Sequence, residues 1–172
     1  MKLIRYVIPI LLIFCIPMHS NAETLDSETL HQYCVEAEEE FGVSCYILEA
    51  IAERESRLET TAQNGSCVGL MQVSTKWHKT RAENLDISDW YDPQSNIRIA
   101  ADYFSELLEL TDNDISWALM RYNMKTSTAN AMHDAGKISK YAKGVMDRAH
   151  QLELEAIDRE QLELIYISKH TM

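Results

Sequence analysis

The sequence predicts an all-α protein, and three observations support this fold class. Five glycines and three prolines in 172 residues leave few turn residues for a many-stranded sheet. Apolar residues recur at helical spacing through nearly all of the chain after residue 22. Hydrophobic residues make up 46% of the chain and charged residues 25%, which is typical of a folded domain rather than a disordered one. At this length we expect one domain.

The first 22 residues are expected to lie outside that domain. Lys2 and Arg5 form a basic start, residues 7–16 are an almost unbroken apolar run, and Ser20 to Ala22 are small or polar. This order is typical of a secretory signal peptide. A retained membrane anchor is the alternative, but the apolar run is well short of the about 20 residues that a spanning helix needs. We therefore expect a protein that is exported to the cell envelope or beyond it.

The first two helices of the exported part can be placed from periodicity and end signals. A helix is expected over about residues 27–41, with one apolar stripe and with Gly42 directly after its end. The next helix is expected over about 44–57. A loop should follow over 59–68, because that segment contains the turn-forming run from Asn64 to Ser66.

Helical spacing continues from there to the end of the chain. Further helices are expected at about 69–84, 93–110, 113–123, 126–134 and 137–166. The last one carries alternating charge and ends in a polar part. We therefore divide the exported chain into a helical domain over residues 23–152 and a charged, solvated helical extension over 153–172.

The net charge argues against two classes of partner. Aspartate and glutamate number 27 against 16 lysines and arginines, which gives a formal net charge of −11. Proteins that bind the nucleic-acid backbone or anionic lipid headgroups use clustered cations. We expect neither nucleic acid nor a membrane surface as the partner.

Glu55 is the most informative single residue. It shares a helix face with Leu48 and Ile51, whereas Glu49 and Glu53 are expected on the opposite, solvated side. Burial and the negative end of the helix dipole both disfavour a charged carboxylate there, so its pKa should be raised. A raised pKa suits a group that donates a proton near neutral pH. From spacing alone, an ion pair with an arginine (Arg57 or Arg121) explains a buried glutamate equally well.

An ordered set of short motifs accompanies Glu55. The set consists of Glu55-Ser56, Gly69-Leu70-Met71-Gln72, Tyr122-Asn123 and Tyr141. In this order and spacing it resembles the soluble lytic transglycosylases, peptidoglycan-cleaving enzymes with a lysozyme-like, goose-type helical fold. The likeness covers roughly residues 33–152 and is closest to the compact, single-domain secreted members. The segment after Gln72 and the Met124-Lys125 pair after Asn123 depart from the family's pattern.

The resemblance implies a mechanism and a set of site residues. Glu55 would be the single general acid/base for cleavage of the MurNAc-β-1,4-GlcNAc bond, with a 1,6-anhydromuramyl product and without metal or cofactor. The substrate-binding residues would be Ser56, Gly69, Met71, Gln72, Tyr122, Asn123 and Tyr141. The partner would be peptidoglycan glycan strands, and the protein would act as a monomer. A hydrolytic muramidase on the same fold and a non-catalytic wall-binding factor are the alternatives.

Several of these residues also have a purely structural interpretation. Met71 fits a core position by its pattern, Tyr122 and Tyr141 can simply pack, and Asn123 can cap a helix. Tryptophans are more often buried in the core than stacked on sugar rings, so the three tryptophans are left outside the predicted site. Those tryptophans are Trp77, Trp90 and Trp117.

Three cysteines remain after residue 22, which in an oxidising compartment suggests one disulfide and one free thiol. We favour a Cys45–Cys67 bridge, because it would clamp the loop before Gly69 across the helix of Glu55. Closing that loop would contribute about 3 kcal/mol. A Cys34–Cys45 bridge is the rival. The spacing of cysteines and histidines matches no common metal motif.

Overall fold

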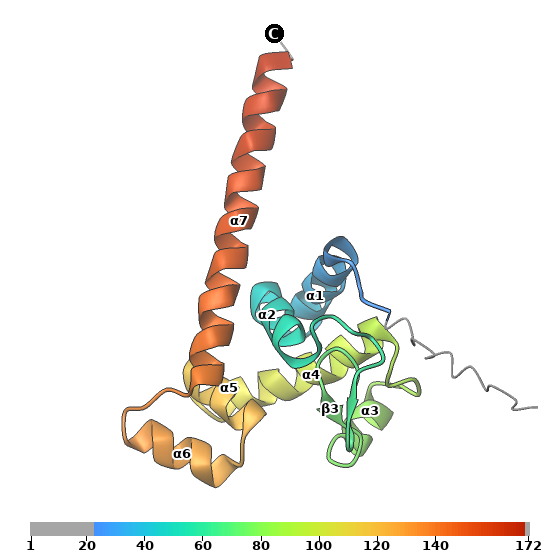
Figure 1. Ribbon diagram of the computed structural model, residues 1–172, viewed down its shortest axis with the longest axis vertical. Helices are drawn as coiled ribbons and strands as arrows, with labels where there is room; N and C mark the ends of the chain where they lie inside the picture. Colours follow the sequence, from blue (N-terminus) through green and yellow to red (C-terminus); the bar gives the residue numbers. More distant parts are fainter. Residues whose placement is uncertain (1–22, 171–172) are drawn as a thin grey trace, which may run out of the picture.

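The computed structural model describes residues 23–170, so the predicted signal peptide lies outside the described residues. The all-α prediction is confirmed: helices dominate, and the described strands are only two residues each (Figure 1). The helices are α1 (Ser27–Phe41), α2 (Cys45–Ser56), α3 (Lys79–Asn84), α4 (Pro93–Glu109), α5 (Ile115–Asn123), α6 (Thr126–Asp134) and α7 (Lys140–His170). The strands are β1 (Gln63–Asn64), β2 (Cys67–Val68) and β3 (Val73–Ser74).

The segment between α2 and α4 is where the sequence prediction fails. The expected loop holds β1 and β2, and the expected helix over 69–84 forms only as α3. The three strands pair as one antiparallel sheet in the order β1-β2-β3. Gly69 and Gln72 have φ angles of 74° and 48°, which no right-handed helix accommodates. Two-residue strands are too short to show an alternating pattern in the sequence.

Aspartate side chains fix the starts of three helices. Asp26 accepts hydrogen bonds from two backbone N–H groups at the start of α1, and Asp92 and Asp114 each accept one in α4 and α5. Such N-caps contribute about 1 kcal/mol each. Gly42 ends α1 with a φ of 70°, so the boundaries predicted for this helix are confirmed.

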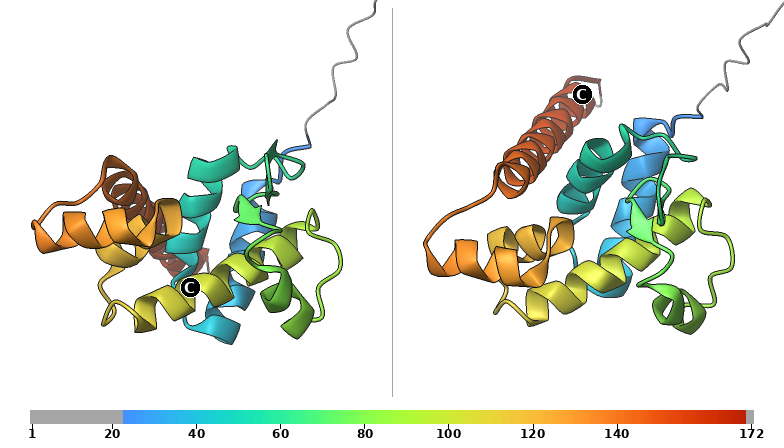
Figure 2. Two further views of the ribbon diagram at one scale, coloured as in Figure 1. Left: turned by 90° about the horizontal axis from the view of Figure 1, so that it is seen from below. Right: turned by 60° about the horizontal axis from the view of Figure 1, so that its bottom comes forward.

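Helix α2 lies in the middle of the domain. It is flanked by α1 on one side and by α7 on the other (Figure 2). Leu48 and Ile51 are fully buried in this core. Arg148 of α7 binds the carboxylate of Glu53 in α2 through two nitrogens, at 2.7 and 2.8 Å, which fixes the two helices in register. The position of α2 is therefore set from both sides.

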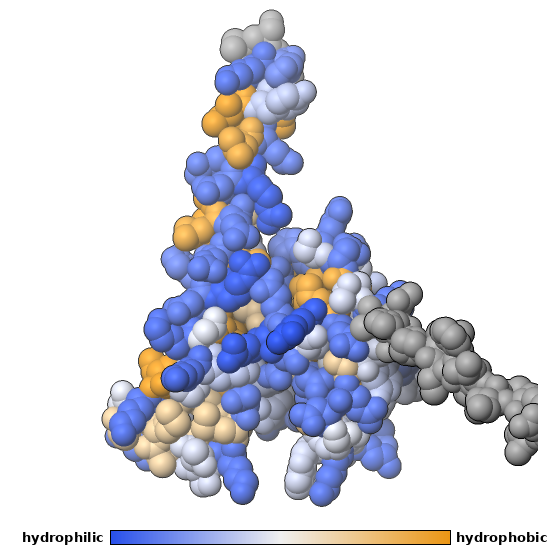
Figure 3. Space-filling view, in the orientation of Figure 1, coloured by the Kyte–Doolittle hydropathy of each residue, from blue (hydrophilic) through white to orange (hydrophobic). Residues whose placement is uncertain are grey.

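Helix α7 continues far beyond the domain as a projecting rod (Figure 1). Its buried residues all lie in the first third, from Tyr141 to Ala149. The projecting part is charged but also carries exposed apolar side chains, visible as separate patches along the rod (Figure 3). These include Leu154, Leu162, Leu164 and Tyr166. The boundary at residue 152 stays a prediction. None of the helices in residues 23–170 combines the length and apolar character needed to cross a bilayer.

The predicted Cys45–Cys67 disulfide is not formed, because Cys34, Cys45 and Cys67 are all free thiols. Cys45 opens α2, whereas Cys67 lies beside the groove at the other end of this helix. Twelve helical residues span about 18 Å, and a disulfide needs Cα atoms about 4.4–6.8 Å apart. The sequence could not reveal that the loop returns to the far end of α2. Burial and the nearby Glu38 carboxylate raise the pKa of the Cys45 thiol to about 12.

Candidate active site

Glu55 stands on the last turn of α2, where the helix reaches the surface. Its side chain is partly buried. The hydroxyl of Tyr141, in the first turn of α7, donates a hydrogen bond to Glu55 Oε1 at 2.6 Å. Tyr141 itself is only 8% exposed. Two residues 86 positions apart therefore meet at one carboxylate.

The environment raises the pKa of Glu55, as its position in the sequence predicts. Desolvation by burial is the largest cause, while the Tyr141 hydrogen bond and the charge of Arg54 act in the opposite direction. The alternative of a structural ion pair with Arg57 or Arg121 is wrong for this fold. Among residues 23–170, Glu55 forms no ion pair and is hydrogen-bonded to Tyr141, while Arg121 Nη1 donates to a backbone carbonyl at 3.4 Å.

Two surface hollows meet beside Glu55. One, of about 540 Å³, contains Glu55, Ser56 and Glu59. The other, of about 790 Å³, contains Tyr122, Asn123 and several aromatic and basic side chains. Gln72 lines both hollows, so they adjoin at this side chain, and the two together are called the groove. Two adjoining open hollows suit a chain-like ligand better than one small enclosed cavity would.

Gly69 and Met71 lie beneath the groove rather than on its walls, and their contact with substrate stays a prediction. Both are fully buried. A Cβ at Gly69 would lie 2.4 Å from Nδ2 of Asn96. Asn96 Oδ1 accepts from the Met71 backbone N–H at 2.8 Å, and its Nδ2 donates to the Val68 carbonyl at 3.1 Å. The glycine is therefore required by the packing of this buried amide rather than by the approach of a ligand.

Gln72 and Ser56 also make internal contacts. Gln72 Nε2 donates to the carbonyls of Gly69 and Ala62, at 2.9 and 3.1 Å, which holds the loop under the groove. Ser56 donates back to the Ala52 carbonyl and is 8% exposed. Both residues line the hollow of Glu55, so the structure brings them to the site. Their side-chain hydrogen bonds support the walls of this hollow.

The Tyr122-Asn123 pair lies at the groove, as its motif predicts. Tyr122 donates its hydroxyl hydrogen bond to the Met71 carbonyl at 2.8 Å, and its ring packs against Tyr103 with centroids 5.7 Å apart. Desolvation raises the pKa of Tyr122, and the Glu55 charge adds to that rise. Asn123 is exposed on the wall of the larger hollow. Tyr122 thus joins the loop of Met71 to the helix α5.

The sequence interpretation missed several groove residues. Trp77 is 76% exposed on the wall of the larger hollow, where the sequence analysis treated it as core. His78 lies beside it, and burial and the neighbouring Arg81 charge lower its pKa. Arg81 is held by Asp102 and Glu106. The polar run from Thr75 to Lys79 around Trp77 is the signal that could have marked this tryptophan as exposed.

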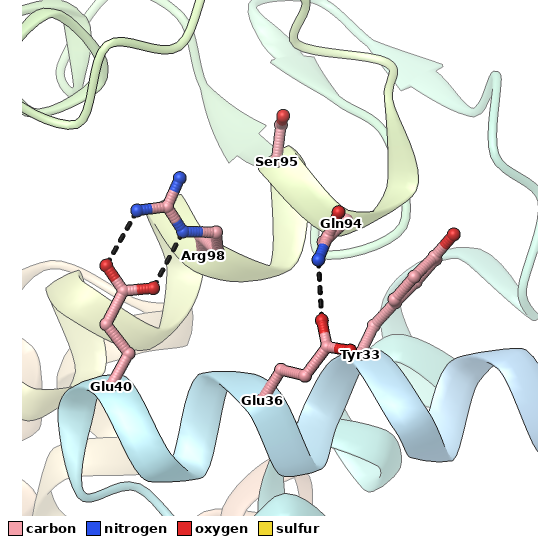
Figure 4. Close-up of a pocket in the computed structure, with 6 residues that line it drawn as sticks. All are labelled: Tyr33, Glu36, Glu40, Gln94, Ser95 and Arg98. Atoms are coloured by element: carbon pink, nitrogen blue, oxygen red, sulfur yellow. Dashed lines mark hydrogen bonds and ion pairs between the residues drawn. The ribbon is translucent and has the colours of Figure 1, made fainter.

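A second concave region lies between α1 and α4, away from Glu55. Figure 4 shows that its charged and polar groups bind one another: Arg98 pairs with Glu40, and Gln94 donates to Glu36 at 2.6 Å. Its volume is about 230 Å³. Because these groups satisfy each other, the region is a helix–helix contact rather than a second candidate site.

The helical fold, with the groove beside Glu55, defines a lysozyme-like helical domain. The Transglycosylase SLT domain family model matches residues 32–143. This match spans well over half of the chain, and the chain belongs to that family.

Solved structures share this fold at low sequence identity. The 70-kDa soluble lytic transglycosylase in complex with bulgecin A superposes with a TM-score of 0.63 at 17% identity, over 77% of this chain and 25% of that one. The 70-kDa enzyme from Escherichia coli gives 0.59 at 18% identity, over 73% and 24%. An inactive mutant of lytic transglycosylase Slt from Pseudomonas aeruginosa gives 0.53 at 22%, over 58% and 17%. This chain therefore corresponds to about a quarter or less of these larger proteins.

Proposed function

We propose that the protein is a peptidoglycan lytic transglycosylase in which Glu55 is the single general acid/base. The observation that carries the proposal is the Glu55 carboxyl, held by Tyr141 at 2.6 Å in an open groove, with a pKa raised by burial. Membership of the Transglycosylase SLT domain family supports the same chemistry. The action on glycan strands would take place in the cell envelope or outside the cell.

The proposed reaction uses one carboxyl group twice, first to donate a proton and then to accept a different one. Protonated Glu55 donates to the glycosidic oxygen between N-acetylmuramic acid and N-acetylglucosamine, and that bond breaks. The resulting carboxylate then takes the proton of the muramyl 6-hydroxyl, whose oxygen bonds to C1 and closes the 1,6-anhydro ring. The hydroxyl is already part of the substrate, so it attacks at high effective molarity and no second carboxylate is needed. Tyr141 keeps Glu55 in position through both steps.

A hydrolytic muramidase is the second candidate, and Glu59 is the reason to test it. Glu59 lines the same hollow as Glu55. Ordinary glycosidases use a second carboxylate as nucleophile or to activate water. If Glu59 had that role, its loss would abolish cleavage and the products would carry reducing ends.

The deciding experiment is digestion of purified peptidoglycan, with mass spectrometry of the fragments. We expect anhydromuramyl ends from the wild type and from Glu59→Gln, and a loss of at least about 100-fold for Glu55→Gln. Reducing ends from the wild type, lost in Glu59→Gln, would establish the hydrolase instead. Full activity of Glu55→Gln would overturn the mechanism, and no cleavage by the wild type would favour a wall-binding protein.

A further inference from the structure

A second group of reactive side chains lies at the opposite end of α2 from Glu55. His31 of α1 and Cys45 and Glu49 of α2 bring one nitrogen, one sulfur and one oxygen within 4.8 Å of one another. Ten residues of helix separate Cys45 from Glu55, about 15 Å along the axis. The group is therefore independent of the groove, of its substrate and of the proposed reaction.

Glu49 is the unexpected member of this group. The sequence pattern placed it on a solvated helix face, but it is only 6% exposed. The pattern failed because α2 is covered by α1 as well as by α7. A buried carboxylate is costly unless it is paired or binds a metal. Its neighbour here is His31 Nδ1, at 2.7 Å.

The surroundings of Cys45 add more negative charge. Glu38 Oε2 accepts a hydrogen bond from the Cys45 backbone N–H at 3.0 Å, so a second carboxylate lies against this residue. Glu38, Glu49 and the thiols of Cys34 and Cys45 thus lie close together beside the partly exposed His31. Such an excess of electron-pair donors is the environment that a divalent cation stabilises.

We propose that His31, Cys45 and Glu49 form a binding site for one Zn²⁺ ion. An imidazole nitrogen, a thiolate and a carboxylate are the three ligand types that zinc uses, and no hard cation such as Mg²⁺ favours this mixture. Bonds of about 2.0–2.3 Å to one ion would hold the ligand atoms somewhat closer together than 4.8 Å, so small side-chain movements would accompany binding. Solvent beside His31 provides the fourth ligand, a water molecule.

Zinc at this place would join α1 to α2. Binding requires the Cys45 thiol to lose its proton, which passes to solvent as the metal–sulfur bond forms. Because the ion would bind only the folded chain, it would stabilise the fold in proportion to its affinity. The readout of the site is therefore metal binding and thermal stability, both independent of activity on peptidoglycan.

The test uses the reduced protein and three probes: Zn²⁺, Co²⁺ and Mg²⁺. We expect calorimetry to give one Zn²⁺ per chain, Co²⁺ to produce a thiolate charge-transfer absorption band, and Mg²⁺ not to compete. Saturating Zn²⁺ should raise the unfolding temperature by about 5–10 °C. His31→Gln, Cys45→Ser and Glu49→Gln should each weaken Zn²⁺ binding by at least about tenfold.

Cys67→Ser is the matched control, because Cys67 is a free thiol beside the groove, and it should bind Zn²⁺ like the wild type. His31→Gln keeps a donor for Glu49 and is the variant that decides if Cys45→Ser fails to fold. The proposal is overturned if no stoichiometric binding occurs, or if His31→Gln binds with unchanged affinity. It is also overturned if thiol mapping of the exported protein finds Cys45 in a disulfide with Cys34.

Discussion

The hydrogen bond from Tyr141 to Glu55 gives the sharpest prediction. Tyr141→Phe removes one oxygen atom and leaves the ring in its buried place. A hydrogen bond to a charged group contributes about 1.5–3 kcal/mol, and the partial exposure of Glu55 favours the lower value. Because this bond stabilises the charged carboxylate, its loss raises the pKa of Glu55 further. At about 1.4 kcal/mol per unit, the basic limb of the pH–rate profile should move up by about one pH unit.

The assay is the initial rate of release of anhydromuramyl fragments across a pH series. We also expect the rate at the optimum to fall by about tenfold, because Glu55 is no longer held in place. Tyr166→Phe is the control, since Tyr166 is 64% exposed on the projecting part of α7. It should leave the profile unchanged. A basic limb of Tyr141→Phe that stays in place or moves down would refute the reasoning.

Four further predictions concern stability and binding. Burial raises the pKa of Glu55, so its charged form destabilises the folded state at pH values above that pKa, and there is no effect at pH values where the carboxyl is protonated in both the folded and the unfolded chain. Glu55→Gln should therefore have a higher unfolding temperature than the wild type at pH 7. The difference between the two unfolding temperatures should vanish below about pH 4. In denaturant titrations Gly69→Ala should lower the free energy of unfolding by about 3 kcal/mol, because its φ is 74° and the added Cβ would clash with a buried side chain. Gly65→Ala should lower it by about 1 kcal/mol, because its φ is 62° but the added Cβ would meet open space. Trp77→Ala should raise KM about fivefold with an unchanged unfolding temperature, because its side chain is exposed on the groove wall. A chain ending after Ala156 should unfold within about 2 °C of the full chain in calorimetry, since the residues removed are almost all exposed.

The helices were predictable because their signals are local. Asp26 caps the start of α1 and Gly42 its end, and Asp92 and the following proline mark the start of α4. Apolar periodicity predicts the helical residues that follow these start signals. The short strands and the loop of Gly69 were not predictable. Their shape depends on Asn96, which reaches back from α4 to bind two backbone groups of this segment.

Glu55 and Glu49, both in α2, show what each source of information contributes. The sequence by itself determined the helical fold and the family resemblance, and it singled out Glu55 as a carboxylate on an apolar stripe, because period, caps and motif order are properties of neighbouring residues. Only the tertiary structure decided that Tyr141 holds Glu55, that Trp77 faces the groove, and that Glu49 is buried against His31. Burial of a residue in α2 depends on what packs on each side of it, and that is fixed by α1 and α7, which lie elsewhere in the chain.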